Sequence, residues 1–168
     1  SHPGTRAFWA ALGDPDARPY LRARSEFFAR PLPPEAIESL LRALGLPRAS
    51  GESRELDFMP WGGAYNRRDP GATAFVHRDA QFLLKHAVAT ASPAAAGTDG
   101  GRRWLDASWA SVHPWGSNRA FQNFADPDLP DWPTAYYGAN LPRLARNKAR
   151  YDPTDFFRHP QSIPMVPA

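Results

Sequence analysis

The chain has 168 residues, with 20 Lys and Arg against 17 Asp and Glu and a formal net charge of +3 at pH 7. This length suffices for one domain with its own core, and no basic run reaches the length that marks a nucleic-acid-binding patch. Because the chain has no Cys, it cannot form a disulfide, a thiolate zinc site or a Cys nucleophile of its own.

The first half of the chain predicts an extended segment at 21–30 and then a helix. Pro33 and Pro34 start this helix, and Gly45 with Pro47 ends it. Its apolar residues recur at helical spacing, and they are Ile37, Leu40, Leu41 and Leu44. We expect these four side chains to pack the helix on a sheet.

The middle of the chain predicts strands at 54–60, 73–78 and 81–90, separated by the turn signals "GG" and "DPG". The two faces of the last strand mix apolar residues with polar ones, His86 on one face and Gln81 and Lys85 on the other. Such faces suit a sheet with a helix layer behind it and a ligand or a second domain in front. Residues 92–101 form a predicted loop, and Leu105, Trp109 and Val112 then recur at the spacing of a helix that ends at Pro114.

The last third predicts a short extended piece at 119–124 and a second helix. This helix is entered at Asn140, with Pro142 in its first turn, and it ends at Asp152. Taken together, the elements predict an α+β fold, with an antiparallel sheet and helices packed on one of its faces.

Local catalytic motifs are missing from the sequence. The five His residues have no metal-ligand spacing, and no phosphate-binding glycine loop, dinucleotide-binding fingerprint or nucleophile elbow is present. A lone His on a strand, such as His86, is more often a packing residue than a catalyst. No apolar run is long enough to span a membrane, and the first 30 residues lack the pattern of a signal peptide, so we expect a cytoplasmic protein without a metal.

Four stretches of the chain resemble, in order and spacing, the C-terminal part of berberine-bridge-like FAD-linked oxidases of the vanillyl-alcohol oxidase type. They are "RARSEFFARPLPPEAIESLL", "LDFMPWGGAYNRRDPGATAFVHRDAQFLLKHAV", "AFQNFADPDLPDWPTAYYGAN" and "LPRLARNKARYDPTDFFRHPQSIP". The last is the most specific, because it joins a Leu-x-x-x-Lys helix to Asp-Pro and Gln-Ser-Ile-Pro.

The resemblance implies how the chain is organised. Residues 1–118 correspond to the C-terminal portion of a substrate-binding domain, and residues 119–168 correspond to the berberine-bridge-like segment that returns to the FAD-binding domain. That FAD domain is not in these 168 residues. The end of the chain would therefore be a docking segment whose Phe156, Phe157 and Ile163 bury against a partner fold.

The resemblance also implies a chemistry, in which hydride passes from an alcohol, sugar or natural-product ring to FAD and dioxygen usually reoxidises the flavin. Several positions would contact the cofactor, and they are Phe121, Asn123, Tyr137 and Asn140. Others would contact the substrate, and they are Tyr65, Asn66 and Phe124.

Two departures from the family pattern affect the catalytic base. Phe124 stands where many members have a Tyr base, and Asn66 or Arg67 replaces an acidic residue. The remaining candidate bases are Tyr65 and His77, each more often structural than catalytic in such a context. Two alternatives stay open: the base comes from another part of the protein, or the substrate is acidic enough to need no base.

A second hypothesis comes from a different class of protein. The chain would be a natural truncation without flavin that binds, cyclises or isomerises a hydrophobic small molecule, and self-association would cover its docking surface. Under the first hypothesis its partner is an N-terminal FAD-binding domain or chain.

Overall fold

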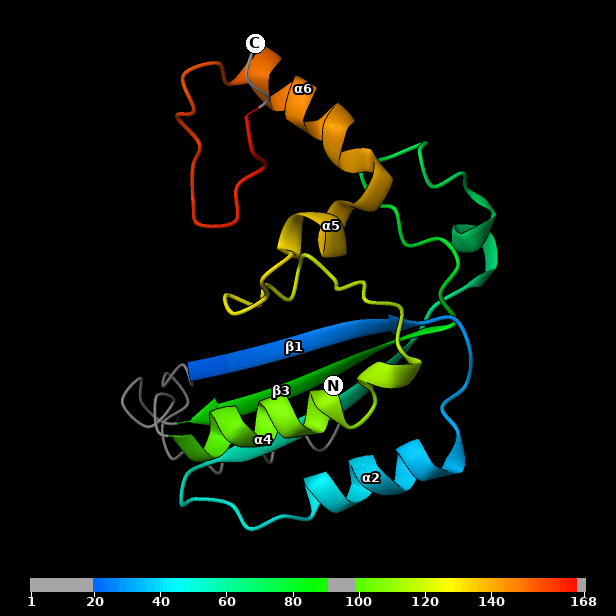
Figure 1. Cartoon of the computed structure of the whole chain (residues 1–168), viewed down its shortest axis with the longest axis vertical. Coiled ribbons are helices and arrows are strands. Elements are labelled where there is room, and N and C mark those ends of the chain that lie inside the picture. The colour runs from blue at the N-terminus through cyan, green and yellow to red at the C-terminus, as the bar shows by residue number, and fades with distance from the viewer. Residues whose placement is uncertain (1–19, 91–98, 166–168) are drawn as a thin grey trace. The chain divides into compact units, whose positions relative to one another are not determined.

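The computed structural model describes residues 20–90 and 99–165 (Figure 1). Contacts group these residues into two compact units. The first contains 20–24, 32–57, 85–90 and 99–115, and the second contains 25–31, 58–84 and 116–165. Each strand contributes residues to both units. The predicted domain division between residues 118 and 119 concerns a longer protein and stays a prediction.

Three strands form one sheet: β1 (Tyr20–Phe28), β2 (Ser53–Pro60) and β3 (Phe82–Thr90). Strand β3 lies between the other two, and β1 and β3 run in opposite directions (Figure 1). The central position of β3 explains why side chains on both of its faces are largely buried. The α+β prediction and the strands predicted at 54–60 and 81–90 are confirmed.

The strand predicted at 73–78 is wrong. Residues 75–78 carry no strand pairing, because side chains bind the polar backbone groups of this segment. The Thr73 carbonyl accepts hydrogen bonds from Asn140 and Arg143, at 3.1 and 3.3 Å, and the Phe75 amide donates to the Thr73 hydroxyl at 3.3 Å. These two backbone groups are therefore satisfied without a neighbouring strand.

The first unit contains helices α2 (Pro34–Leu44) and α4 (Asp99–Ala110), which pack on each other. The Trp104 indole donates to the Ala43 carbonyl at 2.9 Å. The core of the unit combines residues of both helices with residues of β2 and β3, and these are Leu44, Leu56, Val88, Trp104 and Leu105.

The apolar face predicted for α2 is rotated in the structure. Ala36, Leu40 and Ala43 are buried, whereas Ile37 and Leu41 remain 45% and 59% exposed. The small Ala side chains allow a close approach that larger side chains would prevent, so contact with the core follows size as well as hydropathy.

His86 fills a buried position in the same unit. Its Nδ1 lies 2.9 Å from the Ser108 hydroxyl of α4. Burial, with a smaller contribution from the Arg24 guanidinium, lowers the pKa of His86 to about 3. His86 is therefore a neutral packing residue at pH 7, as its place in the strand predicts.

The second unit contains two 3-10 turns, η1 (Gly63–Arg67) and η3 (Gly138–Asn140), and two helices, α5 (Trp132–Tyr137) and α6 (Leu141–Tyr151). Helix α6 is the predicted second helix. The predicted extended piece at 119–124 is not a strand: the Ala120 amide donates to the Ala135 carbonyl of α5, and residues 122–124 form a turn. Helix α5 was not predicted, since Pro130 precedes it and Pro133 lies in its first turn.

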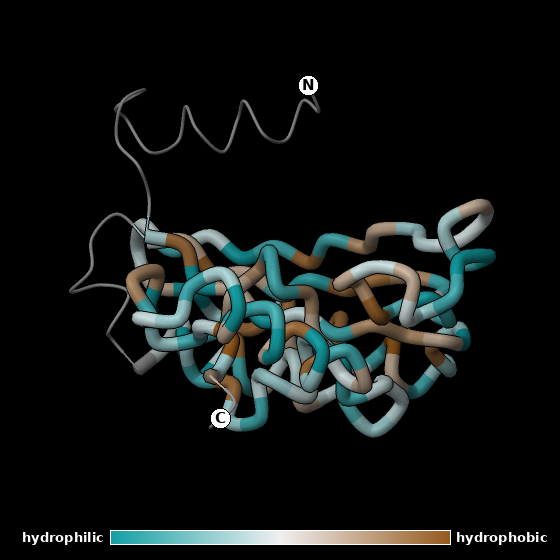
Figure 2. The backbone as a smooth tube through the Cα atoms, turned by 90° about the horizontal axis from the view of Figure 1, so that it is seen from above, coloured by the Kyte–Doolittle hydropathy of each residue, from teal (hydrophilic) through white to brown (hydrophobic). Residues whose placement is uncertain are grey.

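Among residues 20–90 and 99–165, no helix is both long and apolar enough to cross a membrane. Hydrophobic positions are interrupted by hydrophilic ones along the chain (Figure 2).

Candidate functional site

An aromatic cluster lies at the centre of the second unit. Its members come from β1, from the segment between β2 and β3, and from the turn after residue 119, and they are Phe27, Trp61, Tyr65, Phe75, His77, Phe121 and Phe124. Neighbouring ring centroids are 4.3 to 6.1 Å apart, mostly edge to face, which is the favoured geometry for aromatic pairs. Four predicted site residues, Tyr65, His77, Phe121 and Phe124, are thus brought together.

The glycine pair after β2 positions Tyr65. The Trp61 amide donates to the Gln81 carbonyl at 2.7 Å, which holds the end of β2. Gly62 and Gly63 then adopt φ values of 154° and 73°, where residues with a Cβ are strained. Turn η1 can therefore fold back, and the Tyr65 ring lies 5.2 Å from Trp61 and 5.1 Å from Phe75.

Tyr65 is a protonated phenol at neutral pH. Burial raises its pKa, and the neighbouring Trp61 indole and the Arg78 charge oppose that rise less strongly. The Arg78 guanidinium lies 4.5 Å from the centre of the Tyr65 ring.

His77 is fully buried, and its ring stacks on Phe27 at a centroid distance of 4.3 Å. Burial is the main cause that lowers the pKa of His77 to about 4, the Arg119 charge adds to it, and the Tyr136 carbonyl opposes it. The imidazole is therefore neutral at pH 7.

The predicted cofactor contacts lie in two places. Phe121 belongs to the aromatic cluster, and its amide donates to the Ser25 hydroxyl at 3.0 Å. Asn123 is exposed two residues further along. Tyr137 instead packs against the cluster formed by Ala120, Ala135 and Tyr136.

Asn140 is buried at the start of α6 and is not a member of the aromatic cluster. Its Nδ2 donates to the carbonyls of Pro70 and Thr73, at 2.7 and 3.1 Å. The contacts that the structure shows for this amide group are therefore structural.

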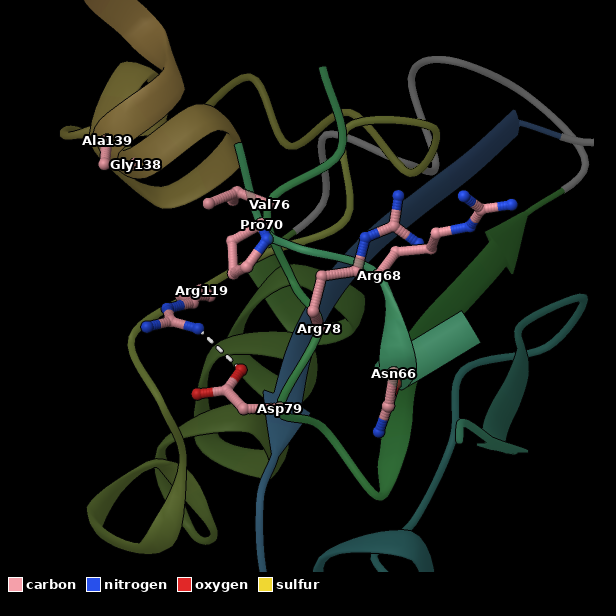
Figure 3. A pocket seen from close by; sticks show the side chains of 9 residues that line it. All are labelled: Asn66, Arg68, Pro70, Val76, Arg78, Asp79, Arg119, Gly138 and Ala139. Atoms are coloured by element: carbon pink, nitrogen blue, oxygen red, sulfur yellow. Dashed lines mark hydrogen bonds and ion pairs between the residues drawn. The ribbon is translucent and has the colours of Figure 1, made fainter. Parts of the chain in front are cut away.

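Asn66, a predicted substrate contact, lines a pocket of about 380 Å³ in the second unit (Figure 3). Its Nδ2 donates to the Ala80 carbonyl at 2.7 Å, whereas its Oδ1 is buried without a hydrogen-bond partner among the described residues. Charged residues that the sequence did not single out share the pocket: Arg68, Arg78, Asp79 and Arg119.

Within the part of the chain that the structure describes, no group of three or more His, Asp or Glu side chains is placed to hold a metal ion.

Residues 120–164 match the family described as berberine and berberine like. An uncharacterized FAD-linked oxidoreductase of Bacillus subtilis is 31% identical over 146 residues, which cover 87% of this chain and 31% of that protein. The structure of berberine bridge enzyme-like protein 28 from Arabidopsis thaliana is 28% identical, with a TM-score of 0.79 over 89% of this chain and 34% of that one.

A third relative is a glycopeptide hexose oxidase, whose structure was solved in complex with teicoplanin. It is 26% identical, with a TM-score of 0.76 over 88% of this chain and 32% of that one. The chain spans about three-tenths of the length of the curated relatives that it matches. The resemblance seen in the sequence is confirmed: the chain is similar to the C-terminal part of berberine bridge enzyme-like, FAD-linked oxidoreductases.

Proposed function

We propose that this chain is the C-terminal, flavin-contacting and substrate-contacting portion of an FAD-dependent oxidoreductase that oxidises an alcohol, a sugar or a natural-product ring. The observation that carries the proposal is the place of Phe121 and Asn123. They begin the berberine-like segment, and Phe121 packs into the cluster that also holds Tyr65.

The residues present fit a flavin. A flat apolar ring system with polar edges needs an aromatic wall and amide groups around it. Phe121 and Phe124 supply such a wall, and the exposed Asn123 amide lies between them in the chain. In addition, Oε1 of Gln122 and Oδ1 of Asn66 are buried without hydrogen-bond partners among the described residues, which is expected where a ligand or another polypeptide covers a site.

A bound flavin would supply the hydride acceptor, with dioxygen as the final oxidant. The protein's part is to hold the substrate and exclude water. Tyr65, as a phenol whose pKa is raised, would contact the substrate without removing its proton. His77, with a pKa lowered to about 4, is a weak base at neutral pH, and we assign it to supporting Phe27.

A sugar or a glycosylated natural product is the substrate class that we favour. The glycopeptide hexose oxidase supports this choice by its name and by its structural similarity to the chain.

The proposed partner is an FAD-binding domain that covers the end of the chain. Phe156 and Phe157 are 77% and 74% exposed, as expected of a docking segment, and Ile163 is half-buried. Gln161 nevertheless holds the nearby backbone on its own unit, since its Nε2 donates to the Asp126 carbonyl at 2.7 Å.

A visible absorption spectrum and an intact mass of the complete native polypeptide that contains this chain would test the proposal. Flavin absorption bands and a mass that includes an FAD-binding domain are expected. A colourless, monodisperse protein without an FAD domain would overturn it and favour the flavin-free binding protein, cyclase or isomerase.

Asn123→Leu in that complete enzyme tests the contact itself. Loss of one hydrogen bond to the flavin, about 0.5–1.5 kcal/mol, should slow flavin reduction about three- to tenfold or weaken flavin binding to the same extent. Asn147→Leu is the control, since Asn147 is exposed on α6. Equal stopped-flow reduction rates and equal flavin affinities in both variants would reject the role of Asn123.

A further inference from the structure

The pocket of about 380 Å³ in the second unit is lined by more positive than negative groups. The lining residues include three arginines, Arg68, Arg78 and Arg119, and one carboxylate, that of Asp79, so two positive charges are in excess. Figure 3 shows Arg119 joined to Asp79 and the side chains of Arg68 and Arg78 apart from this pair.

Arg78 is a cation held in place by neutral groups. Its Nη2 donates to the Thr73 hydroxyl at 2.8 Å, and its guanidinium lies over the rings of Tyr65 and Phe75 at 4.5 and 5.0 Å. Its Nε is buried without a hydrogen-bond partner among residues 20–90 and 99–165. Because that Nε has no accessible surface, a ligand in the pocket would contact the outer nitrogens of the guanidinium, for which an oxyanion is the natural partner.

The other two arginines differ in their ion pairing. Arg119 pairs with Asp79 at 2.7 Å, but both side chains are partly exposed, so this pair contributes little stability. Arg68 is exposed and makes no ion pair with any residue that the structure describes. One of the three charges is thus partly neutralised within the pocket, and two are not.

The remaining wall consists of the polar Asn66 and of small apolar residues. Val76 and Pro70 form part of it, and Gly138, at φ 46°, adds no side chain. A low-dielectric wall beside charges of one sign strengthens the attraction for an anion. The volume also lies within the roughly 300–1,000 Å³ of small-molecule sites, which is more than a bare anion needs.

We propose that this pocket binds the oxyanion of a small molecule, a carboxylate or a phosphate, with Arg78 as the fixed ligand and Arg68 closing on the outer side. The Arg fork matches the geometry of both groups. Asp79 lowers the positive charge of the site, because it holds Arg119 in an ion pair. The proposal concerns anion binding by these residues and does not depend on flavin chemistry, so the two can fail separately.

Calorimetric titration of the full chain with inorganic phosphate, and separately with acetate, at constant ionic strength tests the proposal. Arg68→Gln should weaken binding about tenfold, since it removes a charge-assisted hydrogen bond. Arg67→Gln is the matched control, because Arg67 is also an exposed arginine, adjacent in sequence, that does not line the pocket. Its affinity should equal that of the unmodified chain.

Asp79→Asn provides a prediction of opposite sign. Removing the carboxylate frees Arg119 and raises the excess positive charge of the pocket, so phosphate should bind about three- to tenfold more tightly. All three substitutions are at exposed residues, and equal thermal unfolding midpoints will confirm that the fold is retained. Equal weakening by Arg67→Gln and Arg68→Gln, unchanged affinity in Asp79→Asn, or a dissociation constant weaker than about 10 mM for both anions would overturn the proposal.

Discussion

A buried carboxylate in the second unit explains one glycine that has no unusual backbone angle. Glu26 is buried, and its Oε1 accepts a hydrogen bond from the Asn118 amide at 2.8 Å. A Cβ added at Gly116 would lie 2.1 Å from that oxygen. The glycine is required there by the close approach of a polar side chain that cannot move without losing its partner.

Gly116→Ala should therefore destabilise the protein by about 1–3 kcal/mol, as overpacking does, measured by urea unfolding. Gly45→Ala is the control, because a Cβ there would meet the Leu41 carbonyl oxygen at an ordinary 3.5 Å. The control should change stability by less than about 0.5 kcal/mol. A Gly116→Ala variant as stable as its parent would contradict the placement of Glu26.

Two buried histidines should make the protein sensitive to acid. Burial is the main cause that lowers the pKa of His77 to about 4 and that of His86 to about 3, whereas both have a pKa near 6.5 when unfolded. Above pH 6.5 both histidines are neutral in the folded and in the unfolded chain, so they do not change the free energy of unfolding. As the pH falls below 6.5, only the unfolded chain takes up these protons, and the folded state loses stability until the pH reaches the folded pKa.

The expected loss is at most about 1.4 kcal/mol per pH unit for each of these residues. Urea midpoints at pH 7.5, 6 and 5 will show it, and His86→Gln should reduce the slope below pH 6.5. His159→Gln, a change at an exposed residue of the tail, should leave the slope unaltered. A slope that is the same in His86→Gln and its parent would refute the role of His86.

At the scale of elements, Asn140 joins the start of α6 to the segment before β3. Its amide group binds two backbone carbonyls, those of Pro70 and Thr73, that no strand pairing satisfies. The segment therefore depends on a side chain from a distant helix for its conformation, and this dependence explains why its alternating sequence does not form a strand.

Asn140→Ala should cost about 0.5–1.5 kcal/mol, because it removes the hydrogen bond to the Pro70 carbonyl and one of the two to the Thr73 carbonyl, which keeps that from Arg143. Residues 70–75 should also exchange their amide hydrogens faster, as measured by mass spectrometry. The exposed Asn147 of the same helix supplies the control, Asn147→Ala. Equal amide exchange of residues 70–75 in the two variants would show that the hydrogen bonds of Asn140 do not hold this segment.

At the scale of the whole molecule, the end of the chain presents an apolar surface on a fixed loop. Asp152 accepts hydrogen bonds from the amides of Phe156 and Phe157, at 2.7 and 3.1 Å, and pairs with Lys148. The two phenylalanine rings meet edge to face at 5.0 Å, and Tyr151 is exposed as well. An ordered, exposed group of aromatic side chains is typical of a surface that a partner covers.

The 168-residue chain by itself should therefore self-associate. Replacing both phenylalanines, Phe156→Ser with Phe157→Ser, should shift light scattering at micromolar concentration toward the monomer, because it removes the apolar surface while retaining the backbone bonds to Asp152. Leu46→Ser, at an exposed apolar residue outside the tail, should leave the light scattering unchanged. If the unmodified chain is already monodisperse and monomeric, the prediction that this apolar surface drives self-association is wrong.

The sequence by itself determined the features that depend on interactions between residues close in sequence. Period and capping predicted β3, α2 and α6, and four stretches of sequence, taken in order, indicated the resemblance to berberine-bridge-like oxidases. These features follow from neighbouring residues, because backbone propensity, turn chemistry and linear motifs act within a few positions.

Only the tertiary structure decided which face of α2 is buried, that residues 73–78 form no strand, and that Arg68, Arg78 and Arg119 line one pocket. The same holds for the aromatic cluster, which joins Phe27 to Phe121 across most of the chain. These features depend on contacts between residues far apart in sequence, and side-chain size, buried hydrogen bonds and unpaired charges select among arrangements that local patterns permit equally.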